Sequence, residues 1–542
     1  MTLSEAARRT LDPATRAYLE ELEGNARSSK KAEDRWRRKY ETLEQRYEVL
    51  EERHRLLLFK RFARSSEQEP VGQQQLFAEA EETAEGVEPD ETEATTLTVT
   101  VPAHERKKAG RKAIDPRHPR IEILHDMSDE QKHCGCGEEL VRIGEETREI
   151  VQVIPEQMWI ERHVYPKYGC HACEGSGDED RPAVRIAARE ATILPRSIAS
   201  TALVAFILVN KFVDHLPFYR QENRFARIGI DISRQDMSNW TIAVARAIKP
   251  LLKRFVLMIR DGPFIQMDET PLQVLNEPGR ANTTKSYMWL ARGGPPQAPV
   301  VVYHYSPTRG GDYPRSILDG FEGYLQADGY RVYRMLAEEI GFTLVGCWAH
   351  ARRRFHEAAQ ASKKAGAAHE GMKYIRRLYE IERQLRGEDL SSQEFVDKRR
   401  EKVRPVLDEF SSWLTAKHQT VVPSSLLGTA VTYALHEWDA LSRYLDRPEI
   451  TPDNNAAENH VRPFVVGRRN WLFSGAPQGA EASCAIYSLI ETAKHNGLDP
   501  FAYLNYVFQK APLIHDAEGW DQLLPNRLDK ATLTAALPTA LK

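Results

Sequence analysis

The stretch from Phe264 to Thr270, FIQMDET, decides the fold, because an apolar run ends there in the carboxylate of Asp268. Apolar and polar residues alternate loosely along it, which predicts a central strand, Gly262 to Asp268, whose polar end lies at a functional site. Two more strand-like runs follow at Lys285–Ala291 and Ala298–Tyr305, separated by turns rich in Gly and Pro. Three strands with short connections predict an antiparallel meander.

Helices and strands are expected to alternate after the meander. We predict a helix at 312–318, a strand at 323–326 that leads to Asp328, a helix at about 330–339 and a buried strand at 343–348. This order resembles that of the ribonuclease H-like core. In that core the first and fourth strands carry neighbouring aspartates, and the last helix carries a glutamate that points toward them.

The third carboxylate is expected in Asn454–Asn459, NNAAEN, where Thr451-Pro452 has the character of a cap and first turn of a helix carrying Glu458. The long gap before it is strongly helical at 370–386 and 391–417, which predicts a helical insertion at about 356–450. Mg²⁺ prefers oxygen ligands, so a few carboxylates and substrate phosphates suffice to hold it. Two such ions about 4 Å apart stabilise both the attacking and the leaving oxygen of phosphoryl transfer. Taken singly, each of these acids would more often be a solvated loop residue than a metal ligand.

Length and composition predict a large protein of several domains. A chain of 542 residues is too long for one hydrophobic core, so three or more domains are expected. No run of ~18 apolar residues is present and the N-terminus lacks an apolar signal core. These features predict a cytoplasmic protein with no membrane partner.

Local charge is strongly asymmetric, although 75 basic residues nearly balance 78 acidic ones. Residues 79–93 contain eight acids and no base, whereas residues 104–120 are strongly basic. Such a basic segment is typical of proteins that bind a polyanion, and a solvated linker would share its composition. The basic residues that we assign to DNA contact here are Arg106, Lys107, Lys108, Arg111 and Lys112.

The N-terminal segment, residues 1–66, is predicted to be a dimeric coiled coil. Apolar residues recur at alternating steps of three and four from Leu19 to Leu57, and charged residues fill most other positions. The alternative is that this helix packs against its own chain. Residues 67–103 are predicted to be an acidic flexible linker.

Four cysteines in residues 121–180 predict a zinc ribbon-like module with one structural Zn²⁺. The first pair is C-x-C, tighter than usual, so His133 competes with Cys134 as a ligand, and His171 is a weaker candidate. Strand-like runs at 149–154 and 158–165 separate the two pairs. A ribbon that has lost its metal is the alternative, whereas Cys347 and Cys484 have the surroundings of ordinary core residues. The predicted zinc ligands are Cys134, Cys136, Cys170 and Cys173.

Residues 190–255 are predicted to form a helical DNA-binding region. Helices at 197–213 and 218–228 are followed by a Gly-containing turn, and Ser233 is placed to cap a third helix at 234–247. This order fits a helix-turn-helix, and it is also common in ordinary helix packing. The expected DNA-contacting side chains on the third helix are Arg234, Gln235 and Asn239.

Basic residues flank the predicted carboxylates. In 347–355, CWAHARRRF, His350 and Arg353 are predicted to contact phosphates, and a packing role for His350 is the alternative. Arg462 lies one turn after Glu458 on the same predicted helical face. The other arginines predicted to follow a nucleic-acid backbone are Arg468 and Arg469.

The chain resembles the DDE transposases of the insertion-sequence-66 family over nearly its full length. The matching stretches are 58–67 (LFKRFARSSE), the cysteine module, 266–270 (QMDET), 327–330 (ADGY), 347–353 (CWAHARR), 454–459 (NNAAEN) and 490–500 (IETAKHNGLDP). The resemblance implies a multidomain α/β protein whose catalytic domain, residues 260–485, precedes a C-terminal segment, 486–542. It also implies that Asp268, Asp328 and Glu458 form a catalytic triad holding two Mg²⁺ or Mn²⁺ ions. Asn459, where a basic residue is expected, and the C-x-C pair are the departures.

The resemblance also predicts the function: a bacterial transposase, associated with the nucleoid when bound, that acts on terminal inverted repeats and target DNA. Accessory proteins encoded by the element are further expected partners. Two other classes compete with it. One is a nuclease of the same core that never joins strands, and the other is an inactive, transposase-derived DNA-binding protein.

Overall fold

The computed structural model describes residues 12–62, 158–169, 184–362 and 366–538. By its internal contacts the chain divides into two compact units, one comprising residues 1–86 and 190–542 and the other residues 87–189. The basic residues assigned between Arg106 and Lys112 and the four predicted zinc ligands lie outside the described residues.

In the smaller unit, the described residues form one two-stranded antiparallel pair. Strand β1 (Lys167–Gly169) pairs with β2 (Val184–Ile186), with Tyr168 opposite Arg185. The predicted strand at 158–165 is wrong, because those residues have no strand partner and Ile160 and Val164 are largely exposed. The run at 149–154 lies outside the described residues.

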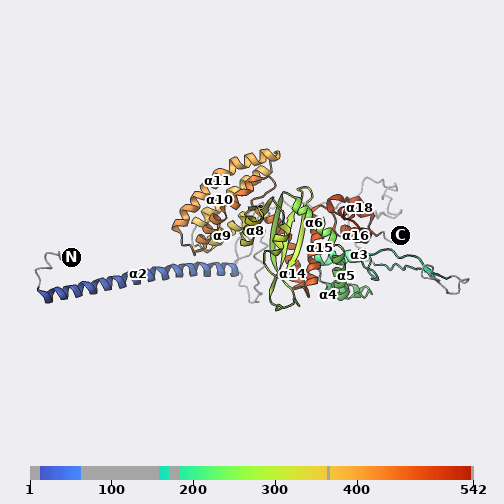
Figure 1. Ribbon diagram of the computed structural model, residues 1–542, viewed down its shortest axis with the longest axis horizontal. Coiled ribbons are helices and arrows are strands. Elements are labelled where there is room, and N and C mark those ends of the chain that lie inside the picture. Colours follow the sequence, from blue (N-terminus) through green and yellow to red (C-terminus); the bar gives the residue numbers. More distant parts are fainter. Residues whose placement is uncertain (1–11, 63–157, 170–183, 363–365, 539–542) are drawn as a thin grey trace, which may run out of the picture. The chain divides into compact units, whose positions relative to one another are not determined.

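A five-stranded mixed sheet forms the centre of the larger unit (Figure 1). Its strand order is β5-β4-β3-β6-β7, in which β3, β4 and β5 form the predicted antiparallel meander and β6 and β7 add in parallel to β3. The first strand runs five residues beyond Asp268, because Gln273 still pairs with Lys285. The strands are β3 (Phe264–Gln273), β4 (Lys285–Gly293), β5 (Val300–Ser306), β6 (Tyr324–Gln326) and β7 (Thr343–Val345).

Helices follow the strands in the predicted order. Helix α7 (Asp312–Leu318) precedes β6, and α8 (Arg331–Ile340) joins β6 to β7. The last strand ends three residues earlier than predicted, because helix α9 (Trp348–Ala361) already begins at Trp348. Left-handed Gly341, with φ 101°, ends α8 and allows the tight turn into β7.

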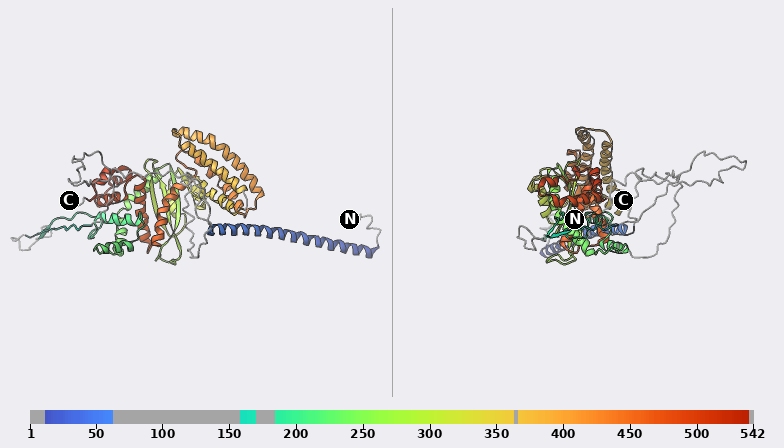
Figure 2. Two further views of the ribbon diagram at one scale, coloured as in Figure 1. Left: turned by 180° about the vertical axis from the view of Figure 1, so that it is seen from behind. Right: turned by 90° about the vertical axis from the view of Figure 1, so that its right-hand side faces the viewer.

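The predicted helical insertion is present and has an apolar core of its own. Helix α10 packs against both α9 and α11 (Figure 1 and Figure 2), and Trp348, Phe355 and Phe410 belong to the shared core. The Trp348 and Phe410 rings are stacked with centroids 5.9 Å apart. The insertion consists of α10 (Ala367–Arg386), α11 (Ser392–Thr420), α12 (Leu426–His436), α13 (Trp438–Ser442) and the 3₁₀ turn η2 (Arg443–Asp446).

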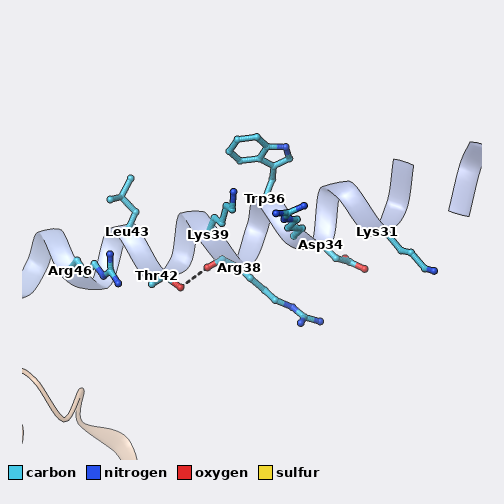
Figure 3. A pocket seen from close by; sticks show the side chains of 9 residues that line it. Lys31, Asp34, Trp36, Arg38, Lys39, Thr42, Leu43 and Arg46 are labelled. Atoms are coloured by element: carbon cyan, nitrogen blue, oxygen red, sulfur yellow. Dashed lines mark hydrogen bonds between the residues drawn. The ribbon is translucent and has the colours of Figure 1, made fainter. Parts of the chain in front are cut away.

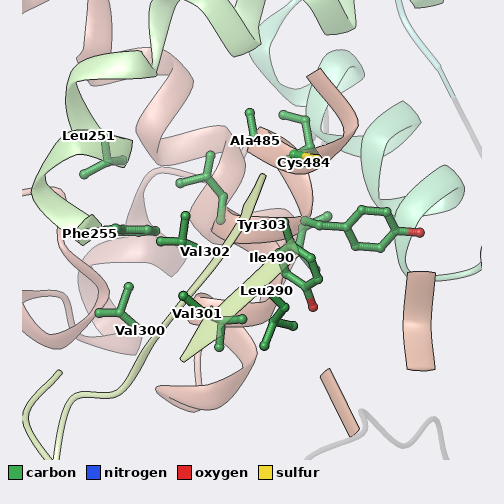
Figure 4. Packing of buried hydrophobic residues seen from close by; sticks show 14 of the residues in the cluster. Leu251, Phe255, Leu290, Val300, Val301, Val302, Tyr303, Cys484, Ala485 and Ile490 are labelled. Atoms are coloured by element: carbon green, nitrogen blue, oxygen red, sulfur yellow. The ribbon is translucent and has the colours of Figure 1, made fainter. Parts of the chain in front are cut away.

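The main core lies between the sheet and helices that come before and after it in the sequence. Leu251 and Phe255 of α6 (Lys249–Asp261) pack on the same cluster as Val300 to Tyr303 of β5 and Ile490 of α15 (Pro477–His495), as Figure 4 shows. Helix α14 (Asn455–Trp471) contacts β3. The remaining C-terminal helices are α16 (Pro500–Lys510), α17 (Ala517–Asp521) and α18 (Lys530–Ala535), with 3₁₀ turns η3 (Ala511–Leu513) and η4 (Pro525–Arg527).

Helix α15 covers the outer edge of β5. The backbone N–H of Val301 donates to Thr492 Oγ1 at 3.0 Å, and that of Tyr303 donates to Ser488 Oγ at 2.9 Å. The Thr492 hydroxyl in turn donates to the Val301 carbonyl at 3.1 Å. Hydroxyl groups of a helix thus satisfy the outward-facing groups of an edge strand, which would otherwise invite pairing with another chain.

The three helices predicted in residues 190–255 are present, and α6, which was not predicted, follows them before the sheet. Helix α3 (Thr201–Phe212) packs on α16, and α4 (Phe218–Arg227) packs on α5 (Arg234–Ala247). Gly229, with φ 79°, makes the turn between α4 and α5, and the Ser233 side chain accepts the Asp236 N–H as the predicted cap. The helix, turn and capped helix are confirmed, whereas DNA binding by them stays a prediction.

Helix α2 (Pro13–Phe62) is a single helix of 50 residues. Trp36 and Leu43 point away from it on the same side (Figure 3), and like Tyr40, Tyr47 and Leu50 they are about two-thirds exposed. Only the last turns contact the insertion: Leu56 is buried, and Lys60 pairs with Glu357 at 2.7 Å. Most of the predicted seam is therefore not covered by the other described residues of the same chain. Among the described residues, none of the helices combines the length and apolar character needed to cross a bilayer.

Candidate active site

The register of two parallel strands brings Asp268 and Asp328 together. Gln266 of β3 is paired with Gln326 of β6, and the Gln266 Nε2 donates to Gln326 Oε1 at 2.9 Å. Each aspartate follows its glutamine by two residues, so both continue the same face of strands that lie about 4.8 Å apart. Asp328 Oδ1 accepts the N–H of Tyr330 at 2.9 Å, which fixes the carboxylate at the start of α8.

Electrostatics also point to a cluster of carboxylates. Burial raises the pKa of Asp268 well above its ordinary value, and the negative charges of Glu269, Glu458 and Asp328 raise it further. Mutual repulsion of this kind requires that the groups lie close together in a poorly solvated place. Glu458 is only 5% exposed, and its Oε1 accepts no hydrogen bond from the described residues. Clustered carboxylate oxygens that still have free lone pairs are suitable ligands for a divalent cation such as Mg²⁺.

Glu458 reaches the strands because three of the four residues before α14 are hydrogen-bonded to β6, α9 and β3. Gln326 Nε2 donates to the Thr451 carbonyl at 2.8 Å, and the Trp348 N–H donates to the Pro452 carbonyl at 2.9 Å. Asn454 Nδ2 then donates to the carbonyl of Met267, the residue before Asp268, at 2.9 Å. The predicted helix start at Thr451-Pro452 is wrong: α14 begins at Asn455, since these carbonyls are bonded to other elements.

Arg399, deep in the insertion, fixes the point where the chain returns to the site. Its guanidinium is fully buried and donates to the carbonyls of Tyr444 at 2.6 Å, Arg447 at 2.9 Å and Ile450 at 3.2 Å. The Glu382 carboxylate balances its charge at 2.8 Å. Because Ile450 immediately precedes Thr451, this network positions the segment that carries Glu458.

A second acid on β3, Glu269, is held by residues that the sequence analysis missed. Its side chain is 3% exposed and accepts hydrogen bonds from Arg309 Nε at 2.7 Å and the Tyr333 hydroxyl at 3.2 Å. Arg309 Nη2 also lies 4.0 Å from Asp328 Oδ2. The predicted strand directions could have indicated Arg309. Because β5 runs parallel to β3, the loop after β5, which contains Arg309, lies toward the end of the sheet that carries Asp268.

Cys347 and His350 lie beside Glu458. The Cys347 Sγ, a ring nitrogen of His350 and a Glu458 carboxylate oxygen all lie within 4.8 Å of one another. The His350 Nδ1 is 3.8 Å from Glu458 Oε1, and Cys347 Sγ accepts the Asn454 N–H at 3.3 Å. Cys347 and Cys484 are buried as predicted, but no sequence pattern indicated that Cys347 borders the site.

The predicted basic residues have different surroundings. Arg462 and Arg469 are exposed on α14 and Arg353 is half-buried on α9, whereas Arg468 Nη1 donates to the Pro271 carbonyl and attaches α14 to β3. Burial lowers the pKa of Arg468. On α5, the predicted residues Arg234, Gln235 and Asn239 are all exposed, as are Asp236 and Arg246. Gln235 Nε2 donates to Asn239 Oδ1 at 3.0 Å.

Family models match most of the chain between residues 49 and 526. Residues 196–482 match the model of the Transposase IS66 family, and residues 488–526 match the IS66 C-terminal element. Residues 131–174 match the zinc-finger binding domain of transposase IS66, and residues 49–123 match the model described as Transposase C of IS166 homeodomain.

Two curated relatives come from Sinorhizobium fredii (strain NBRC 101917 / NGR234). The uncharacterized protein y4jD is 34% identical over 410 residues, which cover 73% of this chain and 77% of the relative. The uncharacterized protein y4qI is 30% identical over 413 residues, which cover 74% of each. The match to the family model spans more than half of the chain, with the sheet, the insertion and α14 inside it. The resemblance noted in the sequence is thus confirmed, and the chain belongs to the IS66 family of transposases.

Proposed function

We propose that this chain is an active DNA transposase that cleaves strands at the inverted-repeat ends of its element and joins them to target DNA. Asp268, Asp328 and Glu458 would hold two Mg²⁺ or Mn²⁺ ions on a ribonuclease H-like core. The observation that carries the proposal is the paired register of Gln266 and Gln326, which aligns the two aspartates. The raised pKa of Asp268, caused by burial and by the neighbouring acids, supports a cation site.

The side chains of the protein would position the metal ions, and the ions would neutralise the charge that develops on the reacting oxygens. The cations would supply Lewis-acid stabilisation of the attacking and leaving oxygens. The backbone anchors of Asn454 and Gln326 keep Glu458 beside the aspartates, and the salt bridge from Arg309 keeps Glu269 turned away from solvent. A nicked end would present a 3′-hydroxyl that attacks target DNA directly, with no covalent bond to the enzyme.

The remaining segments would bring DNA to this site. We assign end recognition to the basic segment 104–120, the zinc module 121–180 with one Zn²⁺, and the exposed face of α5. The uncovered stripe of α2 supports a homodimer through residues 1–66, with 67–103 as the tether. DNA affinity would then fall steeply with salt, because binding releases counterions from phosphates.

Nicking and joining of a labelled transposon end test the proposal. With Mg²⁺ and a supercoiled target, the wild-type protein should give a joined product, and Asp268→Asn should give neither nicks nor joints. Asp319→Asn is the matched control, since Asp319 is an exposed acid on the same domain. Undiminished cleavage by Asp268→Asn would refute the triad. Nicks without joints would identify a nuclease, and DNA binding without either would identify an inactive derivative.

A further inference from the structure

Cys347, His350 and Glu458 form a group that the proposed phosphoryl-transfer chemistry does not use in full. Their ligand atoms lie within 4.8 Å of one another. Cys347 lies two residues after β7 as the N-cap of α9, His350 lies in the first turn of that helix, and Glu458 lies in the first turn of α14. We propose that these three side chains bind a thiophilic metal ion, Zn²⁺ being the physiological example, and that this ion inhibits the transposase by capturing Glu458.

The chemistry of the donors separates this site from the magnesium site. A sulfur, an imidazole nitrogen and a carboxylate oxygen are the ligands of zinc, whereas Mg²⁺ selects oxygen alone. Three protein ligands leave a fourth tetrahedral position for water. On binding, the Cys347 thiol gives up its proton to solvent and coordinates as the thiolate.

The geometry requires little movement. Ideal tetrahedral bonds of 2.0–2.3 Å place neighbouring ligand atoms roughly 3.3–3.6 Å apart. The observed separation of His350 Nδ1 from Glu458 Oε1 is 3.8 Å, so closing the site takes shifts of about 1 Å or less between these two groups.

The position of Cys347 is already fixed by its neighbours. Cys347 Sγ is held by the Asn454 N–H at 3.3 Å, and Asn454 in turn is bonded to Met267 of β3. All three ligand residues are buried or half-buried, and Glu458 Oε1 accepts no hydrogen bond from the described part of the chain. A buried carboxylate oxygen with an unused lone pair, facing an imidazole and a sulfur, is the second observation that points to a metal.

Inhibition follows because Glu458 serves both sites, and this consequence rests on the proposed function. A carboxylate drawn toward Cys347 and His350 is turned from Asp268. Zn²⁺ binds nitrogen and sulfur ligands far more tightly than Mg²⁺ does, so magnesium in excess would not displace it. The concentration of free Zn²⁺ would thereby determine the fraction of the transposase that is active.

Metal counting on the full-length protein tests the site without any activity. After dialysis against low Zn²⁺ with excess Mg²⁺, the wild type should hold one more Zn²⁺ per chain than Cys347→Ser or His350→Gln. Cys484→Ser is the matched control, because Cys484 is a buried cysteine of α15 remote from this group, and it should bind like the wild type. With Co²⁺ as probe, the difference should include a sulfur-to-cobalt charge-transfer band.

Equal zinc contents in the wild type and in correctly folded Cys347→Ser would overturn the site. Serine keeps an acceptor for the Asn454 N–H, and circular dichroism would verify folding in both variants. In the strand-nicking assay, Cys347→Ser should raise the half-inhibitory Zn²⁺ concentration by about tenfold or more. An unchanged value would overturn the inhibition. An extra bound Zn²⁺ in a protein that never nicks DNA would instead refute the proposed function and leave the metal site standing.

Discussion

Gln266 and Gln326 are bonded to each other across two parallel strands at 2.9 Å, two residues before the aspartates that those strands deliver. Gln326 also donates to the carbonyls of Thr451 and Gly346. One buried amide therefore joins β3, β6 and the segment that leads to Glu458.

Gln326→Leu should destabilise the fold by about 2–4 kcal/mol, because the carbonyls of Thr451 and Gly346 lose this donor and Gln266 Nε2 loses its acceptor. Urea unfolding measures the loss. Gln393→Leu is the control, since Gln393 is exposed on α11 and bonds only a neighbouring acid, Asp397. Equal stability of the two variants would show that the Gln326 contacts contribute nothing.

Arg399→Met should cost about 3–5 kcal/mol, because the carbonyls that Arg399 bonds lose this donor and buried Glu382 loses one of its two cationic partners. Arg386, at 2.7 Å, is the partner that remains. Part of the loss should return in the double variant with Glu382→Gln, which removes the carboxylate charge. Arg400→Met, an exposed neighbour paired at 3.6 Å with Asp446, should change stability little. Thermal unfolding of the four proteins measures these differences.

Arg309→Met should lower strand cleavage by about 10- to 100-fold with a small change in stability, since Arg309 orients Glu269 beside the proposed metal ligands. The measurement is the cleavage rate as a function of Mg²⁺ concentration. Arg315→Met is the matched control, because Arg315 pairs with Glu339 at the surface. A variant as active as the wild type at every Mg²⁺ concentration would exclude this role.

Asp453 predicts a pH dependence of stability. Burial raises its pKa to about 6, so the folded state holds this proton more tightly than the unfolded state. The favourable contribution is complete below pH 3.8 and is lost as the pH rises through about 6. Relative to the wild type, Asp453→Asn should therefore gain stability between pH 4 and pH 8, by up to about 3 kcal/mol. Unfolding in EDTA checks this, and a difference independent of pH would contradict it.

Leu43→Glu should convert a dimer into monomers, because it puts a charge into the exposed apolar stripe of α2. Arg38→Glu is the control, since Arg38 is an exposed residue of the same helix outside the stripe. Light scattering on the full-length proteins gives the masses. A wild-type monomer, or a Leu43→Glu dimer, would exclude this stripe as the dimer contact.

The parts of the fold that depend on local patterns could be predicted from the sequence. The meander and the positions of Asp268 and Asp328 follow from apolar runs that end at turns or carboxylates. The contacts of Arg399 could not be foreseen, because a buried arginine in a charged helix has the same pattern as a solvated one. The group of Cys347 and His350 with Glu458 likewise depends on how a distant insertion returns to the sheet. The start of α14 was misplaced because tertiary hydrogen bonds outweighed the helix-capping signal at Thr451.

The hydrogen bonds from β5 to α15 have a consequence for folding during synthesis on the ribosome. Thr492 lies 191 residues after Val301, and Ser488 lies 185 residues after Tyr303. At synthesis rates of 5–20 residues per second, the edge of the sheet is open for about 10–40 s while the ribosome makes the rest. The nascent sheet is an aggregation hazard during that interval, so folding chaperones should limit the yield of this protein. An abortive product that ends before α15 would expose that edge permanently and draw complete copies into insoluble material.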